Sequence, residues 1–393
     1  MFNFNYYTPT KVIFGKGSEN QTGLLVKKQN CKKVLIHYGG KSAVKSGLID
    51  RIKASLQQEG IAYTELGGVR PNPKLSLIRK GIELSKKEGV DFILAVGGGS
   101  VIDSSKAIGY GMLYDGDIWD LFSKEVEEVR CMPIGVVLTI SAAGSEMSKS
   151  CVIVNDEKDS IKRGYGNDCC RPVFSIMNPE LTMTLSDWQT ACGCSDILMH
   201  TMDRYFTSGG NMEITDSIAE AVMRTVIKNA LILKENPADY DARAEIMWSG
   251  SLSHNDLTGC GNDGGDHVPH ILEQELSGEY DTTHGAGLAS VWGSWARYVY
   301  KDCLHRFYRF AVNVHDVEDK GSREEVALKG IEKMEEFYRA INMPTSIHEL
   351  GLNLTDEELV HMASMCSDAI GGEFGSAKVL HEEDFLAIYR NAR

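Results

Sequence analysis

The sequence predicts an α/β domain with a mostly parallel sheet, followed by an all-α domain. Three short apolar segments, at 33–40, 91–97 and 133–139, end in turns of small residues and are separated by amphipathic stretches. Strands that alternate with helices in this way form parallel sheets. After about Pro179, apolar residues instead recur at spacings of three and four, which is the helical period.

The elements of the first domain follow from these local patterns. Helices are predicted over 47–59 and 74–88, between the apolar segments, and a last strand is predicted over 173–177. Ligands of parallel sheets bind at the carboxyl ends of the strands, where the chain turns back into a helix. We therefore expect residues 1–182 to form a dinucleotide-binding domain.

The second domain begins with a well-marked helix. Ser186 is a suitable N-cap, and Gln189, three residues later, can complete a capping box. Long helices are predicted over 217–234 and 325–341, where the apolar period is sustained. Residues 183–393 are therefore expected to form the helical domain.

Composition excludes several classes of partner. The chain of 393 residues has 55 acidic and 41 basic residues, a formal net charge of −14. Nucleic acids and anionic membranes need clustered basic surfaces, so neither is expected. The first residues lack the pattern of a signal peptide, and no stretch approaches the roughly 18 apolar residues of a membrane span. Ten cysteines without paired Cys-x-x-Cys spacing predict reduced thiols in a cytoplasmic protein.

A glycine-rich turn after the segment 91–97 is a candidate pyrophosphate site. Successive glycines permit left-handed dihedrals and close approach of a ligand, and the first N–H groups of the next helix face an anion. The spacing differs from G-x-G-x-x-G, and such turns also serve simply to connect a strand to a helix. The turn consists of Gly97, Gly98, Gly99 and Ser100.

Two other turns support a dinucleotide. After the first apolar segment no acidic residue is present to bind a ribose 2′-hydroxyl and repel a 2′-phosphate, so NADP(H) is favoured over NAD(H). That turn consists of Gly39, Gly40, Lys41 and Ser42, where Lys41 also fits a solvated surface lysine. Thr139 and Ser141, after the third segment, suit phosphate or ribose contacts, with a simple helix N-cap as the alternative.

A candidate metal site begins with Asp196 and His200. Four residues apart on a helix, they project from one face. Such a pair is often only a surface hydrogen bond, but the residues between them are apolar. A buried Asp–His pair needs a partner such as a cation, because unpaired buried charge is costly.

The rest of the metal site is predicted from His270 and His284, each at the start of a helical segment. Three imidazoles and one carboxylate suit a divalent ion with an open position for a substrate oxygen. Fe(II) is favoured, and Zn(II) or Mn(II) fit the same ligands. His267 is the alternative to His270. The other histidines, His254 among them, show no partner spacing and are expected to be surface residues or core residues with satisfied hydrogen bonds.

These motifs resemble the iron-containing (group III) alcohol dehydrogenase family, in its butanol dehydrogenase-like branch. The resemblance rests on the motif from Gly97 to Lys106, the Asp196-x-x-x-His200 pair, and His270 with His284. It spans nearly the whole chain, through segments at 9–17, 71–73, 138–147, 171–175 and 275–289.

The resemblance implies a Rossmann-like domain, a helical domain and a dimer joined through N-terminal strands. It also implies that Asp196, His200, His270 and His284 bind the metal. Residues implied to approach the cofactor are Gly39, Gly40, Asn72, Gly97, Gly98, Gly99, Ser100, Asp103, Thr139, Ser141 and Lys162. Asn72 and Lys162 rest on the resemblance alone.

The chain departs from the family pattern beside the metal ligands. Many relatives have a proton-relay histidine four residues after the third ligand, where this chain has Gln274. An amide does not exchange protons near neutral pH, so the relay is absent or rerouted. His267 is a candidate to line the pocket. The glycine-rich acidic loop 258–266 is a candidate to change substrate choice.

Hydride transfer needs the nicotinamide C4 near a carbonyl carbon and an electrophile on the carbonyl oxygen, which a metal with an open position supplies. We therefore expect an NAD(P)-dependent enzyme that interconverts an aldehyde and a primary alcohol. One alternative is a glycerol dehydrogenase-like polyol oxidoreductase on the same fold. The other is a non-catalytic protein that binds a nucleotide and a metal.

Overall fold

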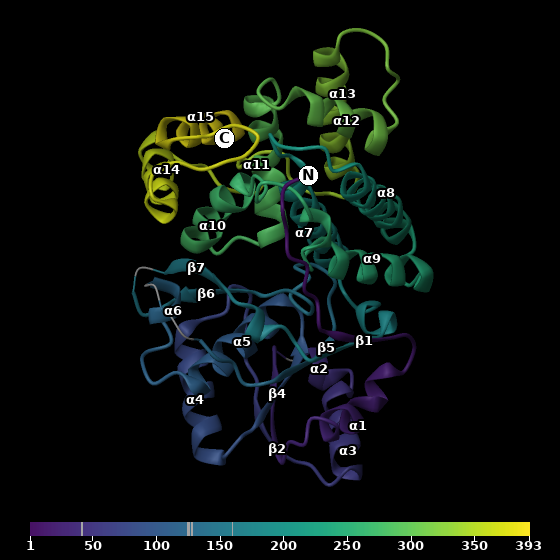
Figure 1. Cartoon of the computed structure of the whole chain (residues 1–393), viewed down its shortest axis with the longest axis vertical. Coiled ribbons are helices and arrows are strands. Elements are labelled where there is room, and N and C mark those ends of the chain that lie inside the picture. The colour runs from purple at the N-terminus through teal and green to yellow at the C-terminus, as the bar shows by residue number, and fades with distance from the viewer. Residues whose placement is uncertain (41, 124–125, 127–128, 159) are drawn as a thin grey trace. The chain divides into compact units, whose positions relative to one another are not determined.

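The computed structural model describes all residues except 41, 124–125, 127–128 and 159 (Figure 1). It divides into two compact units: Thr8–Thr184, and Met1–Tyr7 together with Leu185–Arg393. The sequence analysis assigned residues 1–7 to the first domain, but they belong to the helical unit. The Phe2 N–H donates to the carbonyl oxygen of Gly261 (2.9 Å), and the Phe2 ring lies where a Cβ of Gly209 would be. Within the described chain, every helix is too short or too polar to span a bilayer.

The α/β unit contains a six-stranded sheet whose strand pairs are all parallel. In spatial order the strands are β1 (Lys11–Phe14), β8 (Phe174–Met177), β5 (Ile134–Leu138), β4 (Phe92–Gly97), β2 (Lys33–Tyr38) and β3 (Ala62–Leu66). The four predicted strands are confirmed as β2, β4, β5 and β8. The edge strands β1 and β3 were not predicted, because they are short, partly exposed and mix polar with apolar residues.

Both faces of the sheet are covered by helices. Val34 and Ile36 of β2 pack in one apolar core with α1 (Thr22–Lys27) and α3 (Leu48–Gln58). Leu35, between them, packs in a second core with α4 (Leu75–Glu88) and α5 (Gly99–Leu113). Alternate side chains point to opposite faces of a strand, and both faces of this sheet are buried. The central strands are therefore apolar at nearly every position. The predicted helices at 47–59 and 74–88 are confirmed as α3 and α4.

A second, antiparallel pair was not predicted. Strands β6 (Ser150–Asn155) and β7 (Ile161–Gly166) form a two-stranded sheet of their own. The remaining short elements of this unit are η1 (Ser18–Gln21), α2 (Ser42–Lys45), α6 (Asp120–Ser123), η2 (Asp168–Cys170) and η3 (Pro179–Thr182).

The second unit is helical, and the predicted fold class is confirmed. The Ser186–Gln189 capping box is present at the first helix, with both reciprocal hydrogen bonds. The predicted helices at 217–234 and 325–341 correspond to α8 and α13. The elements are α7 (Asp187–Tyr205), α8 (Glu213–Glu235), α9 (Tyr240–Ser253), η4 (Leu257–Gly259), α10 (Val268–Tyr280), α11 (His284–Val299), α12 (Leu304–His315), α13 (Arg323–Ala340), α14 (Asp356–Ile370) and α15 (Glu382–Ala392).

A buried histidine couples the stability of the α/β unit to pH. His37 of β2 is 0% exposed; its Nδ1 lies 2.7 Å from the Leu66 carbonyl oxygen and its Nε2 lies 2.8 Å from Ser104 Oγ. Burial lowers the pKa of His37 to about 4. The unfolded chain, with a histidine pKa of about 6.5, therefore binds more protons between these values. Stability must fall as the pH falls through this window.

We expect the free energy of unfolding to decrease by up to roughly 3 kcal/mol on account of His37 between about pH 6.5 and pH 4. Denaturant unfolding of wild type and His37→Gln across this range measures the effect. The variant should show a flatter pH dependence, and the exposed-site control His348→Gln should retain the wild-type slope. Equal slopes for His37→Gln and wild type would contradict this origin of the pH dependence.

Candidate metal centre

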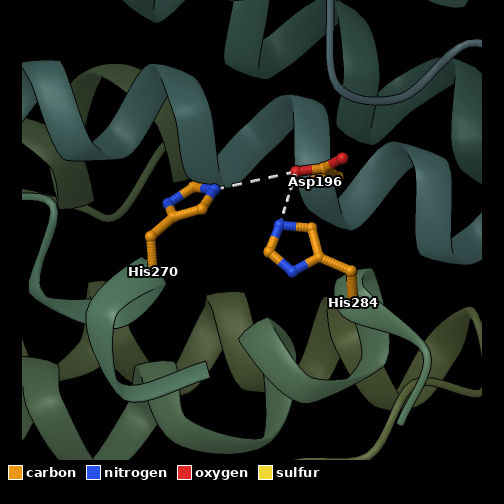
Figure 2. Close-up of side chains that lie close together, drawn as sticks. All are labelled: Asp196, His270 and His284. Carbon is orange, nitrogen blue, oxygen red and sulfur yellow. Dashed lines mark ion pairs between the residues drawn. The ribbon is translucent and has the colours of Figure 1, made fainter. Parts of the chain in front are cut away.

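All four predicted metal ligands lie in the helical unit. Asp196, His270 and His284 form one cluster of candidate donor atoms, and His200 lies beside that cluster next to Asp196. Asp196 and His200 are one turn apart on α7, His270 lies in the first turn of α10, and His284 is the first residue of α11. The Nε2 atoms of His200, His270 and His284 lie 3.3, 3.8 and 3.7 Å from Asp196 Oδ1. Figure 2 shows the Asp196, His270 and His284 side chains pointing toward one another.

Two glycines let α11 begin close to its neighbours. A Cβ on Gly285 would lie 2.0 Å from the Cys192 carbonyl oxygen of α7, and a Cβ on Gly287 would lie 2.8 Å from Glu273 Cγ of α10. Larger residues at either position would force α11 away. The sequence His284-Gly285-x-Gly287 therefore brings the His284 ring toward the other ligands through close packing.

The donor set fits a cation. Asp196 Oδ1 and His270 Nε2 are buried and have no hydrogen-bond partner. Leaving such atoms unsatisfied is costly, and a metal ion would satisfy both. The candidate donor atoms of Asp196, His270 and His284 all lie within 4.8 Å of one another. His267, the alternative ligand, has its Nδ1 3.2 Å from Asp203 Oδ2 instead.

Two buried carboxylates contact the outer nitrogens of these rings. Asp203 Oδ2 pairs with His270 Nδ1, and Glu273 Oε2 pairs with His284 Nδ1. Such partners orient a ligating imidazole and raise its basicity. Although burial disfavours the imidazolium, the charges of Asp203 and Asp196 raise the pKa of His270 to about 9. Burial lowers the pKa of His200 well below its usual value, and the neighbouring His254 adds to this.

The predicted phosphate turn joins β4 to α5, but its glycines act differently from the expectation. Gly97, Gly98 and Gly99 all have φ outside the left-handed region. They are needed for space: a Cβ on Gly98 would lie 1.8 Å from Ile140 Cγ2, and one on Gly97 would lie 2.4 Å from Val101 Cγ2. The turn is therefore held against its neighbours by close packing.

The candidate cofactor residues at the carboxyl ends of three adjacent strands lie together. Tyr38 pairs with Val96 in register, and the Thr139 N–H donates to the Gly97 carbonyl oxygen (3.1 Å). Gly97 ends β4, and Gly39 and Thr139 directly follow the neighbouring strands β2 and β5, with Ser100 in the first turn of α5. Ser141 is buried, whereas Gly40 and Ser42 are exposed. Lys41 lies outside the described residues.

Comparison with known proteins decides the family. Residues 9–179 match the iron-containing alcohol dehydrogenase model, and residues 190–393 match the C-terminal model of the Fe-containing alcohol dehydrogenase family. The chain belongs to the iron-containing alcohol dehydrogenase family. It is 40% identical to NADH-dependent butanol dehydrogenase A of Clostridium acetobutylicum, with 100% of each chain covered.

Two further similar proteins are an aldehyde reductase and a butanol dehydrogenase of known structure. It is 32% identical to the NADPH-dependent aldehyde reductase YqhD of Escherichia coli, with 90% of each chain covered. The crystal structure of NADH-dependent butanol dehydrogenase A from Thermotoga maritima superposes with a TM-score of 0.95 at 38% identity, covering 100% of this chain and 99% of the other. The chain is thus a metal-dependent oxidoreductase of alcohols and aldehydes that uses a nicotinamide cofactor. The comparisons favour this activity over the polyol oxidoreductase and non-catalytic alternatives.

The other three predicted cofactor residues of this alcohol dehydrogenase, Asp103, Lys162 and Asn72, do not lie in the turns that follow β2, β4 and β5. Asp103 accepts hydrogen bonds from Ser145 Oγ (2.5 Å) and the Val152 N–H (3.0 Å), so it braces the chain after β5. Burial raises the pKa of the Asp103 carboxyl. Lys162 of β7 is buried. Asn72 is also buried and has a φ of 54°, which fits the tight turn before α4.

The unusual loop 258–266 of the alcohol dehydrogenase packs against the end of α7. The Asp266 N–H donates to the Asp203 carbonyl oxygen (2.7 Å), and Asn262 Nδ2 donates to that of Arg204 (3.1 Å). Gly265 has a φ of 82°, and a Cβ there would lie 2.5 Å from the Asp203 carbonyl oxygen. The loop therefore holds the backbone that carries Asp203.

The sequence analysis missed several residues around the ligands. Asp203 is three residues after His200 and Glu273 is three residues after His270, so helical spacing would have placed each beside a ligand. His254 was expected to be a surface or satisfied core residue, because no partner spacing marks it in the sequence. Its contact with a candidate ligand was not anticipated: its Nδ1 lies 3.0 Å from His200 Nδ1.

Proposed function

We propose that Asp196, His200, His270 and His284 hold one divalent ion, Fe(II) by preference, and that a small uncharged aldehyde is reduced to its primary alcohol beside it. When bound, the ion supplies a Lewis acid for the carbonyl oxygen, and the nicotinamide supplies the hydride. The observation that carries this proposal is the buried Asp196 Oδ1, which has no hydrogen-bond partner and lies within 3.8 Å of three imidazole Nε2 atoms. A carboxylate with three imidazoles fits Fe(II), and Zn(II) or Mn(II) use the same donors.

We propose that the dinucleotide binds at the strand ends of the α/β unit through the residues that the sequence analysis named there. NADP(H) is our preferred cofactor, because no carboxylate follows β2 to repel a 2′-phosphate. Glu65, on the neighbouring strand β3, forms an ion pair with Lys53, whose Nζ lies 2.8 Å from Glu65 Oε1. The names of relatives differ on this point: the C. acetobutylicum enzyme is NADH-dependent and the E. coli enzyme is NADPH-dependent.

Gln274 and His267 are the proposed catalytic-site residues that distinguish this chain. Gln274 lies one turn after His270 on α10 and is partly exposed. Its amide can hold a water or a ribose hydroxyl that carries the proton, but it cannot itself exchange one near neutral pH. His267 has its Nε2 3.1 Å from the Gly264 carbonyl oxygen, and its side chain is 33% exposed.

A single assay tests metal, cofactor and substrate. Protein reconstituted separately with Fe(II), Zn(II) or Mn(II) is mixed with NADPH or NADH and a panel of aldehydes that includes butanal and charged analogues. We expect oxidation of the cofactor with Fe(II), a higher kcat/KM for NADPH than for NADH, and a preference for uncharged aldehydes. A higher kcat/KM for NADH would overturn the cofactor proposal. No turnover with any combination would overturn the function.

We also propose a homodimer of a cytoplasmic enzyme. Strand β1 is an edge of the sheet, and Phe14 at its end is 42% exposed, so the edge can pair with a second copy. The ten cysteines, all within the described part of the chain, are thiols and form no disulfide, which suits a reducing compartment. Sedimentation should give twice the chain mass of 43.4 kDa, and a species of 43.4 kDa would contradict the dimer.

A further inference from the structure

The three candidate imidazole ligands differ in what contacts their outer nitrogens. His270 and His284 each contact a buried carboxylate, which can only accept a hydrogen bond when ionised. His200 Nδ1 instead lies 3.0 Å from Nδ1 of another imidazole, His254. Either nitrogen of such a pair can be the donor, so the direction of this hydrogen bond depends on a third group.

Arg204 is the third group. Its Nη2 lies 3.3 Å from His254 Nδ1. A guanidinium has no acceptor atom and stays charged, so His254 Nδ1 must offer a lone pair. Two unprotonated nitrogens 3.0 Å apart would repel each other, so His200 Nδ1 must carry the proton and share the single lone pair of His254 Nδ1 with the Arg204 N–H. The proton on Nδ1 leaves a lone pair on His200 Nε2, the atom that faces Asp196 Oδ1 at 3.3 Å.

The fold holds both groups in these positions. Arg204 Nη1 donates to the His200 carbonyl oxygen (2.7 Å), one turn back on α7, and Arg204 is 8% exposed. Close packing also restrains its stem, because a Cβ on Gly259 would lie 3.2 Å from Arg204 Cδ. His254 is the C-cap of α9, and its ring centroid lies 4.0 Å from that of His200.

We propose that Arg204 and His254 are positioning residues that hold His200 in the tautomer able to bind the metal through Nε2. The proposal rests on the proposed ligand set. Arg204 and His254 would thus orient the His200 ring, as Asp203 orients His270 and Glu273 orients His284.

The tautomer can be read directly without metal. Long-range 1H–15N spectra of metal-free protein labelled with 15N-histidine, at mildly alkaline pH, distinguish a protonated from an unprotonated ring nitrogen, and His200→Gln assigns the signals. We expect His200 to carry its proton on Nδ1. In His254→Leu, which removes the acceptor, the signals should move toward a mixture of tautomers. His254→Asn, which keeps a side-chain acceptor, should restore the wild-type pattern. A His200 proton on Nε2 in the wild type would overturn the proposal.

Metal affinity provides the second readout. We expect the Zn(II) dissociation constant to rise about 10- to 100-fold in His254→Leu and to stay within about threefold in His254→Asn. The matched control is His315→Leu, which removes another partly buried imidazole of the same unit and should leave Zn(II) affinity unchanged. Unchanged affinity in His254→Leu overturns this inference. If Asp196→Asn binds Zn(II) as wild type does, the ligand set itself is wrong, and the spectra then test the tautomer alone.

Discussion

Replacing Asp196 with asparagine should abolish metal binding and leave the metal-free fold intact. The carboxylate oxygen Oδ1 is within 3.8 Å of all three imidazole Nε2 atoms, so it is the shared centre of the site. Asparagine has nearly the same shape but no charge. We expect bound metal to fall from about one ion per chain to below a tenth, and kcat/KM to fall by roughly 10³-fold or more, since a Lewis-acid metal contributes several kcal/mol.

The stability of this variant distinguishes loss of a ligand from loss of the fold. The Asp196 charge faces three imidazoles within 3.8 Å and helps to raise the pKa of His270, so its replacement should cost about 3 kcal/mol of unfolding free energy in the metal-free protein, which should still fold. A metal at 100 times its dissociation constant should stabilise wild type by about 2.7 kcal/mol and the variant not at all. Metal analysis and denaturant unfolding with and without Zn(II) measure both effects. A variant that retains one tightly bound ion would contradict the proposed site.

Removing the Asp203 carboxylate should weaken both the fold and the metal site. Asp203 is 1% exposed, and its Oδ2 contacts the Nδ1 atoms of His270 and His267. These two rings hold the pKa of Asp203 well below its usual range, although burial alone would raise it. In Asp203→Ala we expect the metal-free protein to lose about 3 kcal/mol of unfolding free energy, because a buried ion pair loses one partner. The Zn(II) dissociation constant should rise about 10- to 100-fold.

The matched control for Asp203 is His267→Ala. This substitution removes one donor to the carboxylate but leaves the contact between Asp203 and His270. Urea unfolding and competition with a chelator should show a smaller loss of stability and a change in Zn(II) affinity of less than about threefold. If His267→Ala weakens Zn(II) binding as much as Asp203→Ala does, the contact between Asp203 and His270 is not what orients the ligand. Unchanged activity and pH profile in His267→Ala would remove the proposed catalytic role of His267.

The sheet shows where local pattern is sufficient and where it is not. Central strands such as β4 are apolar on both faces, and turn residues mark their ends, so they can be predicted from the sequence. The edge strands β1 and β3 have few buried residues, and hydrogen bonding to β8 and β2 defines them. Their local sequence carries little signal because the partner strand stabilises them. The glycines at 97–99 mark a turn in the sequence, but only packing against Ile140 and Val101 explains why glycine is required.

The metal centre divides in the same way. The sequence by itself determined the candidate ligands, because Asp196 and His200 share a helix face through the 3.6-residue period, and His270 and His284 each open a helix in a distinctive motif. Only the tertiary structure decided what surrounds them. His254 lies at the end of a different helix, 54 residues from His200 in sequence. Helical spacing relates residues within one helix, whereas contact between helices depends on how they pack, which no local pattern encodes.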